Sequence, residues 1–350
     1  MMYAYQMTAR DAPFERVEQT RPEPEVGQAL VQVAGCGVCH TDISYWHHGV
    51  PTRHALPLTL GHEIAGEVVA GDPRWVGKAV VVPAVLPCGS CELCRSGRSN
   101  ICQHQQMPGN DFDGGFATHV LVPDRYLIPV PDSLLDSYRL EELAVVADAV
   151  STPFQVVRKS GLAAGDLAVL IGVGGIGLYA AQIATQTGAV VIAIDIDEQK
   201  LNQVREVGVG RTIHSRGMDI KSIKAEVKAI AKESGVSPYQ WKIFELSGTR
   251  PGQELAYALL GIAGTLSIVG FTLDKVEVRL SNLMAFDATV VGTWGCKPEL
   301  YPEVLQWVDE GRIKIKPFIE LVPLSEINTV FQSALQGSHL KRPVLVPEKP

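Results

Sequence analysis

The stretch AVLIGVGGIG, residues 168–177, decides the fold class of this chain. Its apolar beginning predicts a buried strand over 168–172, and the small residues at its end open a predicted helix over 176–187. A glycine-rich turn of the form G-x-G-x-x-G joins the two. A strand, a glycine-rich turn and a helix in this order are typical of the first unit of a dinucleotide-binding fold.

Each glycine of this turn has a physical reason. Gly172 permits the tight turn, Gly174 lets the backbone approach a pyrophosphate, and Gly177 lets the helix and the strand pack closely. The unpaired N–H groups and the positive dipole end of the following helix favour the same phosphates. We therefore expect a cofactor-binding turn made by Gly172, Gly174, Gly175, Ile176 and Gly177.

An acidic residue indicates which dinucleotide binds. Asp195 lies 18 residues after Gly177, at the end of the next predicted strand, 190–195. A carboxylate there accepts hydrogen bonds from the ribose 2′-hydroxyl and repels a 2′-phosphate, which favours NAD over NADP. A structural glycine turn followed by a surface aspartate is the alternative. The order of strand, turn, helix, strand and acid favours the cofactor site.

The two halves of the chain differ in pattern. Apolar strands alternate with helical segments after residue 150, at 241–246, 265–269 and 289–292, which predicts a doubly wound parallel sheet. The first 150 residues instead show short β-branched runs between turns and predict an irregular β-barrel-like domain. Its expected strands are 29–33, 64–69, 79–85 and 118–122. A chain of 350 residues suits two domains. We expect a first domain over 1–150, a dinucleotide domain over 151–292, and a tail, 293–350, that returns to the first.

Four of the chain's cysteines lie close together in sequence. Cys88, Cys91, Cys94 and Cys102 have the form C-x2-C-x2-C-x7-C. Four thiolates at this spacing can surround one tetrahedral ion, and zinc is the usual choice for an all-sulfur shell. Such a shell leaves no position for substrate, so we expect a structural zinc. The alternatives are an iron–sulfur cluster and four unrelated cysteines.

The chain resembles the zinc-dependent medium-chain dehydrogenases over nearly its whole length. The resemblance rests on Cys39, His62 and Glu63, followed in order by the four cysteines and the glycine-rich turn. The resemblance implies a GroES-like catalytic domain beside the dinucleotide (Rossmann) domain. It also implies that Cys39 and His62 bind a catalytic zinc, with Glu63 an acid that can exchange with the bound oxygen. The third ligand of the family is often a cysteine, but here that position is Asp148. An oxygen ligand keeps the negative charge, is harder than a thiolate, and also admits other divalent ions.

The resemblance implies further roles. Thr41 matches a hydroxyl that passes the substrate proton onward, and Ser44 stands where several relatives have a relay histidine. His47 or His48 is a candidate replacement, and each is equally well explained as a solvated histidine. The remaining cofactor-binding residues that we expect are His40 and Arg342, at positions that meet the pyrophosphate, and Lys200.

Composition and charge exclude other classes of function. The net charge is −7 and the basic residues are scattered, so nucleic acid is not an expected partner. No apolar run is long enough to span a bilayer, and the first residues lack a signal-peptide core, so we expect a cytoplasmic protein without a membrane partner. By analogy with the family we expect a homo-oligomer, either a dimer or a tetramer, with strand 289–292 near a sheet edge.

The expected reaction is oxidation of a secondary alcohol to a ketone with NAD. The segments 106–111, 114–117, 146–153 and 281–287 are similar to those of family members that oxidise a ring hydroxyl of a cyclic acyl-CoA. The alternatives are a general alcohol or polyol dehydrogenase, a zinc-free enoyl or quinone reductase, and a non-catalytic NAD-binding protein. A hydroxyacyl-CoA needs cations for its phosphates, and the candidates are Arg53, Arg250, Lys297 and Lys341.

Overall fold

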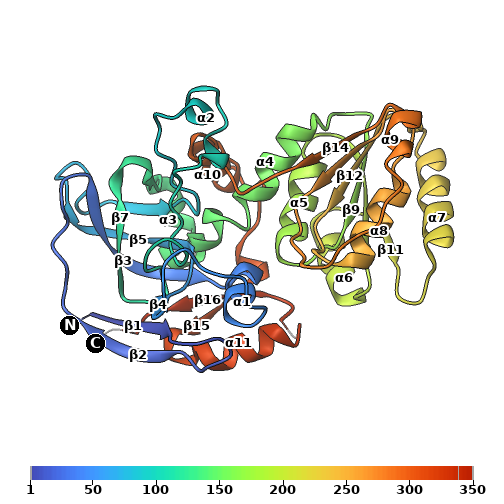
Figure 1. The fold of residues 1–350 in the computed structure, drawn as a ribbon. Helices are drawn as coiled ribbons and strands as arrows, with labels where there is room; N and C mark the ends of the chain where they lie inside the picture. The colour runs from blue at the N-terminus through green and yellow to red at the C-terminus, as the bar shows by residue number, and fades with distance from the viewer. Residues whose placement is uncertain (1, 338, 349–350) are drawn as a thin grey trace. The chain divides into compact units, whose positions relative to one another are not determined.

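The structure is a computed structural model and describes residues 2–337 and 339–348. It divides into two compact units, one made of Met1–Ser151 with Gly295–Pro350 and the other of Thr152–Trp294. The chain therefore leaves the first unit and returns to it, one or two residues from the boundaries expected from the sequence. Figure 1 shows both units, with most of their α-helices and strands labelled. Within the described residues, none of the helices combines the length and apolar character needed to cross a membrane.

The first unit is built on β-sheets. A seven-stranded sheet has the order β15-β16-β3-β5-β6-β8, with β7 paired to β3, and a three-stranded sheet has the order β2-β1-β4. The strands are β1 (Met2–Met7), β2 (Glu15–Gln19), β3 (Gln28–Gly37), β4 (Leu58–Thr59), β5 (Glu63–Gly71), β6 (Ala79–Val82), β7 (His119–Pro123), β8 (Ile128–Pro129), β15 (Ile319–Pro323) and β16 (Arg342–Val346). The apolar faces of these strands enclose a core, which includes Leu58, Ile64, Val80 and Phe116 among its fully buried side chains.

Short helices connect these strands. The α-helices of the first unit are α1 (His40–Trp46), α2 (Glu92–Arg95), α3 (Asp132–Ser137), α10 (Tyr301–Asp309) and α11 (Ile327–Leu335). The 3-10 helices are η1 (Ser99–Ile101), η2 (Asp124–Tyr126), η3 (Leu140–Ala147), η4 (Pro298–Leu300), η5 (Lys316–Phe318) and η6 (Leu324–Glu326). Of these, α1 and η3 matter most for the site, because each carries one of the predicted metal ligands at its end.

The second unit is a parallel sheet with helices. The strand order β11-β10-β9-β12-β13-β14 is the doubly wound arrangement, and the order of the chain reverses between β9 and β12. Its elements are α4 (Ser151–Ser160), β9 (Leu167–Ile171), α5 (Gly175–Thr185), β10 (Val190–Asp195), α6 (Glu198–Glu206), β11 (Arg211–His214), α7 (Ile220–Glu233), β12 (Trp241–Glu245), α8 (Arg250–Leu259), β13 (Thr265–Ile268), α9 (Ser281–Phe286) and β14 (Thr289–Gly292). The predicted fold class is confirmed.

Several predicted elements differ from the structure at their ends. The predicted strand 79–85 ends at Val82, and the strand at 29–33 extends over Gln28–Gly37. The latter is longer because it pairs with both β5 and β7, and register shifts against β5 let it bend without losing that pairing. The helix after the glycine turn begins at Gly175 and ends at Thr185. Strand β14 forms one edge of its sheet, as the sequence indicated.

Candidate metal and cofactor sites

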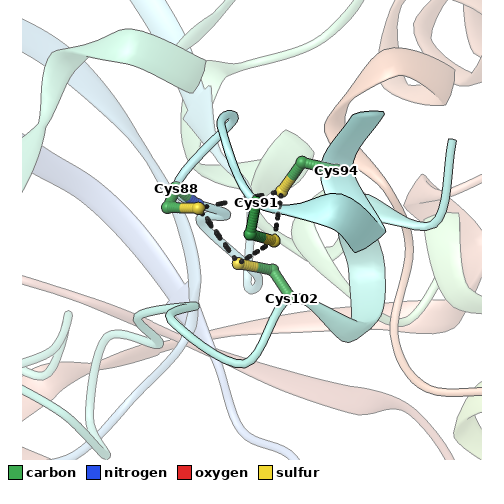
Figure 2. Close-up of side chains that lie close together, drawn as sticks. All are labelled: Cys88, Cys91, Cys94 and Cys102. Carbon is green, nitrogen blue, oxygen red and sulfur yellow. Dashed lines mark hydrogen bonds between the residues drawn. The ribbon is translucent and has the colours of Figure 1, made fainter. Parts of the chain in front are cut away.

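The four clustered cysteines form a near-tetrahedral group of sulfur atoms (Figure 2). The Sγ–Sγ separations are 3.5 Å for Cys91–Cys94 and Cys88–Cys102, 3.6 Å for Cys91–Cys102 and 4.0 Å for Cys88–Cys94. Zinc–sulfur bonds of about 2.3 Å place tetrahedral sulfur atoms about 3.8 Å apart. The four side chains therefore fit a zinc ion without rearrangement.

The loop around these cysteines favours thiolates. Backbone N–H groups of Ser90 and Cys91 lower the pKa of Cys88 to about 5, because they stabilise its anion. Gly89 has φ +73°, and an added Cβ there would lie 2.4 Å from the Tyr126 hydroxyl, so only glycine fits. The Arg125 guanidinium donates to the Cys88 carbonyl at 2.7 Å. The lobe is thus fixed to the body of its own unit.

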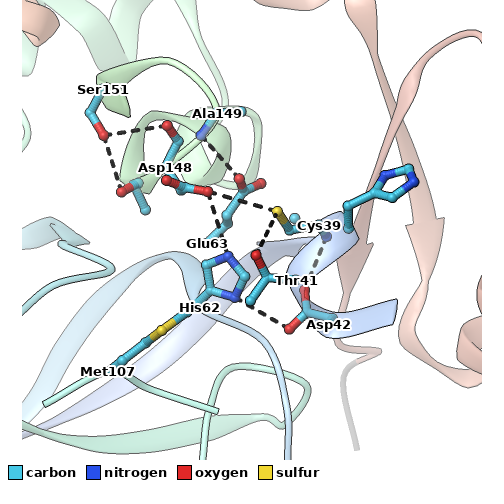
Figure 3. Close-up of polar contacts among 12 residues, drawn as sticks. Cys39, Thr41, Asp42, His62, Glu63, Met107, Asp148, Ala149 and Ser151 are labelled. Carbon is cyan, nitrogen blue, oxygen red and sulfur yellow. Dashed lines mark hydrogen bonds and ion pairs between the residues drawn. The ribbon is translucent and has the colours of Figure 1, made fainter. Parts of the chain in front are cut away.

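A second group of donor atoms comes from three separate parts of the first unit (Figure 3). Cys39 precedes α1, His62 and Glu63 lie at the start of β5, and Asp148 follows η3. One ligand atom from each of these four residues lies within 4.8 Å of the others. The sequence separates Cys39 from Asp148 by more than a hundred residues, and the fold brings them together.

The separations in this group fit zinc. Cys39 Sγ lies 3.7 Å from Asp148 Oδ2, and His62 Nε2 lies 3.6 Å from the same oxygen. Ordinary zinc bond lengths predict about 3.6 Å and about 3.4 Å for tetrahedral ligands. His62 Nε2 is also buried without a hydrogen-bond partner among the described residues. A buried nitrogen of this kind is costly unless a cation or another partner takes its lone pair.

Asp42 is a site residue that the sequence reasoning missed. Its buried carboxylate accepts from the backbone N–H groups of Cys39 at 3.0 Å and Gly61 at 3.2 Å, and it faces His62 Nδ1 at 3.2 Å. A carboxylate on Nδ1 fixes the histidine tautomer and leaves Nε2 for a metal. Burial lowers the pKa of His62, but the neighbouring carboxylates of Asp42 and Asp148 outweigh it and raise the pKa overall. The signal in the sequence was an acid three residues after Cys39, the spacing of a helix capping box.

Glu63 is held by an arginine. Arg342 donates from Nε to Oε2 at 2.8 Å and from Nη2 to Oε1 at 2.7 Å, and the Ala149 N–H donates to Oε1 at 3.0 Å. Burial raises the pKa of Glu63, Arg342 lowers it and Asp148 raises it, with a result of about 6. Gly37 makes room for the carboxylate, since an added Cβ would lie 2.1 Å from Oε2. The arginine expected at the pyrophosphate therefore has a buried acid as its partner here.

The expected proton path is only partly assembled. Thr41 Oγ1 lies 3.7 Å from Cys39 Sγ, beside the donor group. Ser44 donates to the His40 carbonyl of its own helix at 2.9 Å. His47 contacts Asp11, and the His48 ring packs edge-on against the His47 ring. Neither histidine is shown to face Thr41, so their relay role stays a hypothesis. His40 is exposed at the start of α1.

The glycine-rich turn has the open space that a pyrophosphate needs. An added Cβ at Gly174 would meet only the Lys200 ammonium, at 3.8 Å. At Gly172 it would lie 2.6 Å from Ser247 Cα, and at Gly177 2.1 Å from the Gly172 carbonyl oxygen. The first and third glycines are thus required by packing, and the second faces open space beside a cation. Gly175 and Ile176 open α5, where unpaired N–H groups favour an anion.

Asp195 connects the turn to the next strand. Its Oδ2 accepts from the Val173 N–H at 2.8 Å and its Oδ1 from the Asp197 N–H at 3.0 Å. Each carboxylate oxygen keeps a further acceptor position, so a ribose hydroxyl can still bind. The arrangement fits NAD.

Two of the four candidate cations for CoA phosphates form ion pairs with acids. Arg53 pairs with Asp111 at 3.1 Å, and Arg250 pairs with Glu254 at 2.8 Å. Lys297 precedes η4 and Lys341 is exposed just before β16. Arg250 belongs to the second unit, and the other three cations belong to the first.

Comparison with known families agrees with both sites. Residues 25–132 match the family "Alcohol dehydrogenase GroES-like domain", and residues 175–310 match the family "Zinc-binding dehydrogenase". The chain therefore belongs to the zinc-dependent medium-chain alcohol dehydrogenases. Like the family, it is an NAD-dependent oxidoreductase with groups for a structural and a catalytic zinc.

Individual relatives extend over nearly the whole chain. An alcohol dehydrogenase of Geobacillus stearothermophilus is 31% identical over 338 residues, which is 95% of each chain. A sorbitol dehydrogenase of Halalkalibacterium halodurans is 29% identical over 334 residues, 92% of this chain and 93% of that one. The structure of acetophenone reductase from Geotrichum candidum in complex with NAD superimposes with a TM-score of 0.84 at 26% identity, covering 99% of this chain and 97% of that one. None of these names specifies a CoA ester.

Proposed function

We propose that this zinc-dependent dehydrogenase oxidises a secondary alcohol to a ketone, and that its substrate is 6-hydroxycyclohex-1-ene-1-carbonyl-CoA, which becomes 6-oxocyclohex-1-ene-1-carbonyl-CoA in anaerobic degradation of aromatic compounds. The observation that carries the reaction type is the donor group of Cys39, His62 and Asp148, with an NAD turn on the same chain. The narrower substrate rests on the sequence segments 106–111, 114–117, 146–153 and 281–287, which resemble enzymes of that activity.

In this proposal Cys39, His62 and Asp148 hold the catalytic zinc. Zinc bound there supplies Lewis acidity, which favours loss of the alcohol proton. Three protein ligands leave a fourth position for the substrate oxygen, whereas the four-cysteine lobe is closed. Asp42 holds the imidazole of His62, and Thr41 receives the proton and passes it onward. Glu63 is kept beside the ligands by Arg342.

NAD supplies the hydride acceptor. We propose that Gly172, Gly174, Gly175, Ile176 and Gly177 receive the pyrophosphate with Lys200, that Asp195 binds the adenosine ribose, and that His40 and Arg342 contact the cofactor. For Arg342 this requires a shared role, because its guanidinium also holds Glu63.

The alternative within the same reaction class is a general alcohol or polyol dehydrogenase, which the similarity to alcohol and sorbitol dehydrogenases favours. The two donor groups argue against a zinc-free enoyl or quinone reductase, and the full set of ligands and cofactor turn argues against a non-catalytic NAD-binding protein. We propose further that the enzyme works in the cytoplasm. We also propose that it forms a homodimer or homotetramer, since the edge strand β14 carries the exposed Val290 and could pair with a second copy. A mass in solution equal to one chain would contradict the oligomer.

A substrate screen tests the proposal. NADH formation is measured with simple secondary alcohols, with polyols and with cyclic hydroxyacyl-CoA thioesters. Each thioester is also tested as the corresponding free acid. We expect kcat/KM to be highest for the cyclic thioester and to fall when CoA is removed. Equal or better turnover of sorbitol or a simple alcohol would overturn the CoA assignment and leave the reaction type standing.

A further inference from the structure

A buried acid in the second unit has no role in the chemistry described above. Glu245 is the last residue of β12 and has no exposed surface. It stands where the order of strands reverses, because β12 pairs with β9 and Glu245 lies opposite Ile171, the residue before Gly172. Buried carboxylates are rare in protein cores and need compensation by donors.

One oxygen of Glu245 organises the loop that follows β12. Oε1 accepts from the Ser247 N–H at 2.9 Å, from the Ser247 hydroxyl at 2.5 Å and from the Gly248 N–H at 3.1 Å. Three donors on one carboxylate oxygen hold the loop in a single conformation. Hydrogen bonds to a charged acceptor are stronger than neutral ones.

Hydrogen bonds connect this loop to the beginning of α8. The Ser247 hydroxyl lies 3.0 Å from Thr249 Oγ1, which accepts from the Gly252 N–H at 3.1 Å and caps α8. On the other side, the Gly248 loop meets the loop after β13, since an added Cβ at Gly270 would lie 2.2 Å from the Gly248 nitrogen and 2.7 Å from Glu245 Oε2. The carboxylate therefore sits beneath two loops at the carboxyl edge of the sheet.

The same loop packs closely against the glycine-rich turn. Gly172 has φ +82°, and an added Cβ there would lie 2.6 Å from Ser247 Cα and 2.7 Å from Ser247 N. No space separates Ser247 from the first glycine of the turn. A shift of Ser247 would consequently move or loosen the backbone that receives the pyrophosphate.

We infer that Glu245 is a positioning residue for NAD, which acts through Ser247 to hold Gly172 and its turn in the cofactor-binding conformation. Oε2 is left without a hydrogen-bond partner among the described residues, so burial of this carboxylate costs free energy. An apolar side chain would pack here without that cost, which favours a functional reason for the acid. The inference concerns the cofactor and is independent of which alcohol is the substrate.

The test measures NADH affinity in the zinc-loaded enzyme. For Glu245→Gln we expect binding of NADH to weaken by roughly tenfold, the scale of one lost charge-assisted hydrogen bond. KM for NAD should rise while kcat at saturating NAD and zinc content stay near wild type. The matched control is Glu254→Gln, which removes an acid from α8 that pairs with Arg250.

A second pair of variants decides the matter if Glu245→Gln does not fold. Ser247→Ala removes the hydroxyl that joins Glu245 to Thr249, and we expect roughly threefold weaker NADH binding from the loss of part of this network. Ser247→Thr keeps the hydroxyl and should restore affinity. Wild-type NADH affinity in folded Glu245→Gln or in Ser247→Ala would overturn the inference. A fall in kcat with unchanged KM for NAD would overturn it as well.

Discussion

Asp148 is the proposed metal ligand that departs from the pattern implied by the resemblance to the family. The resemblance implies a cysteine at this position, whereas the Asp148 carboxylate lies 3.7 Å from Cys39 Sγ and 3.6 Å from His62 Nε2, separations that suit two ligands of one zinc ion. An oxygen ligand donates less charge than sulfur, so the metal it helps to hold is a stronger Lewis acid and less selective for zinc.

We predict that Asp148→Cys keeps the metal and loses rate. Turnover should fall by roughly tenfold, or about 1.4 kcal/mol in the barrier, because the softer ligand weakens the Lewis acid. Steady-state kinetics with metal analysis measure both quantities, and the exposed Asp136→Asn is the control. Faster turnover than wild type would refute this role for the carboxylate.

A second prediction at this scale concerns cofactor choice. Asp195→Asn keeps an acceptor for the Val173 N–H but removes the charge that repels a 2′-phosphate. The ratio of kcat/KM for NAD to that for NADP should fall by roughly tenfold or more, at about 1.4 kcal/mol per factor of ten. Asp197→Asn, which alters the neighbouring cap of α6, is the control. An unchanged ratio would show that Asp195 does not select NAD.

At the scale of elements, local spacing predicted what lies close in sequence. The glycine turn and the four cysteines are each completed within about fifteen residues, and the structure forms both. Contacts between elements that are distant in sequence could not be predicted from the sequence. Arg342 meets Glu63 across 279 positions, and Asp42 resembles an ordinary helix cap until β5 brings His62 beside it. Such contacts depend on the register of β3 with β5 and β16, which no single segment specifies.

The zinc lobe, residues 88–102, gives a prediction at this scale. Its helix α2 has four residues and none of them is buried, so we expect metal binding to stabilise the lobe. Cys94→Ser should lose one zinc per chain and lower Tm by several degrees, a loss of about 2 kcal/mol or more. Calorimetry and limited proteolysis check this, with Ser96→Ala in the same loop as the control. Retention of both zinc ions would contradict a four-sulfur site.

At the scale of the whole molecule, the metal-binding groups and the cofactor turn lie in different units. The first carries both metal groups and the second carries the cofactor turn. The change from alternating short strands to continuous apolar strands predicted this division, because a parallel sheet covered by helices needs strands that are apolar on both faces. The side chains that select a substrate follow no such periodic pattern, so the substrate could be predicted only from a resemblance.

We propose that one chain binds two zinc ions and that the ion held by Cys39, His62 and Asp148 serves catalysis. Zinc content, NADH affinity and turnover of Cys39→Ser test it most directly when measured on the same preparation. We predict that zinc falls from two ions per chain to one, that turnover is reduced severely, and that NADH binds nearly as in wild type. Wild-type turnover in Cys39→Ser would contradict a catalytic zinc ion at this site.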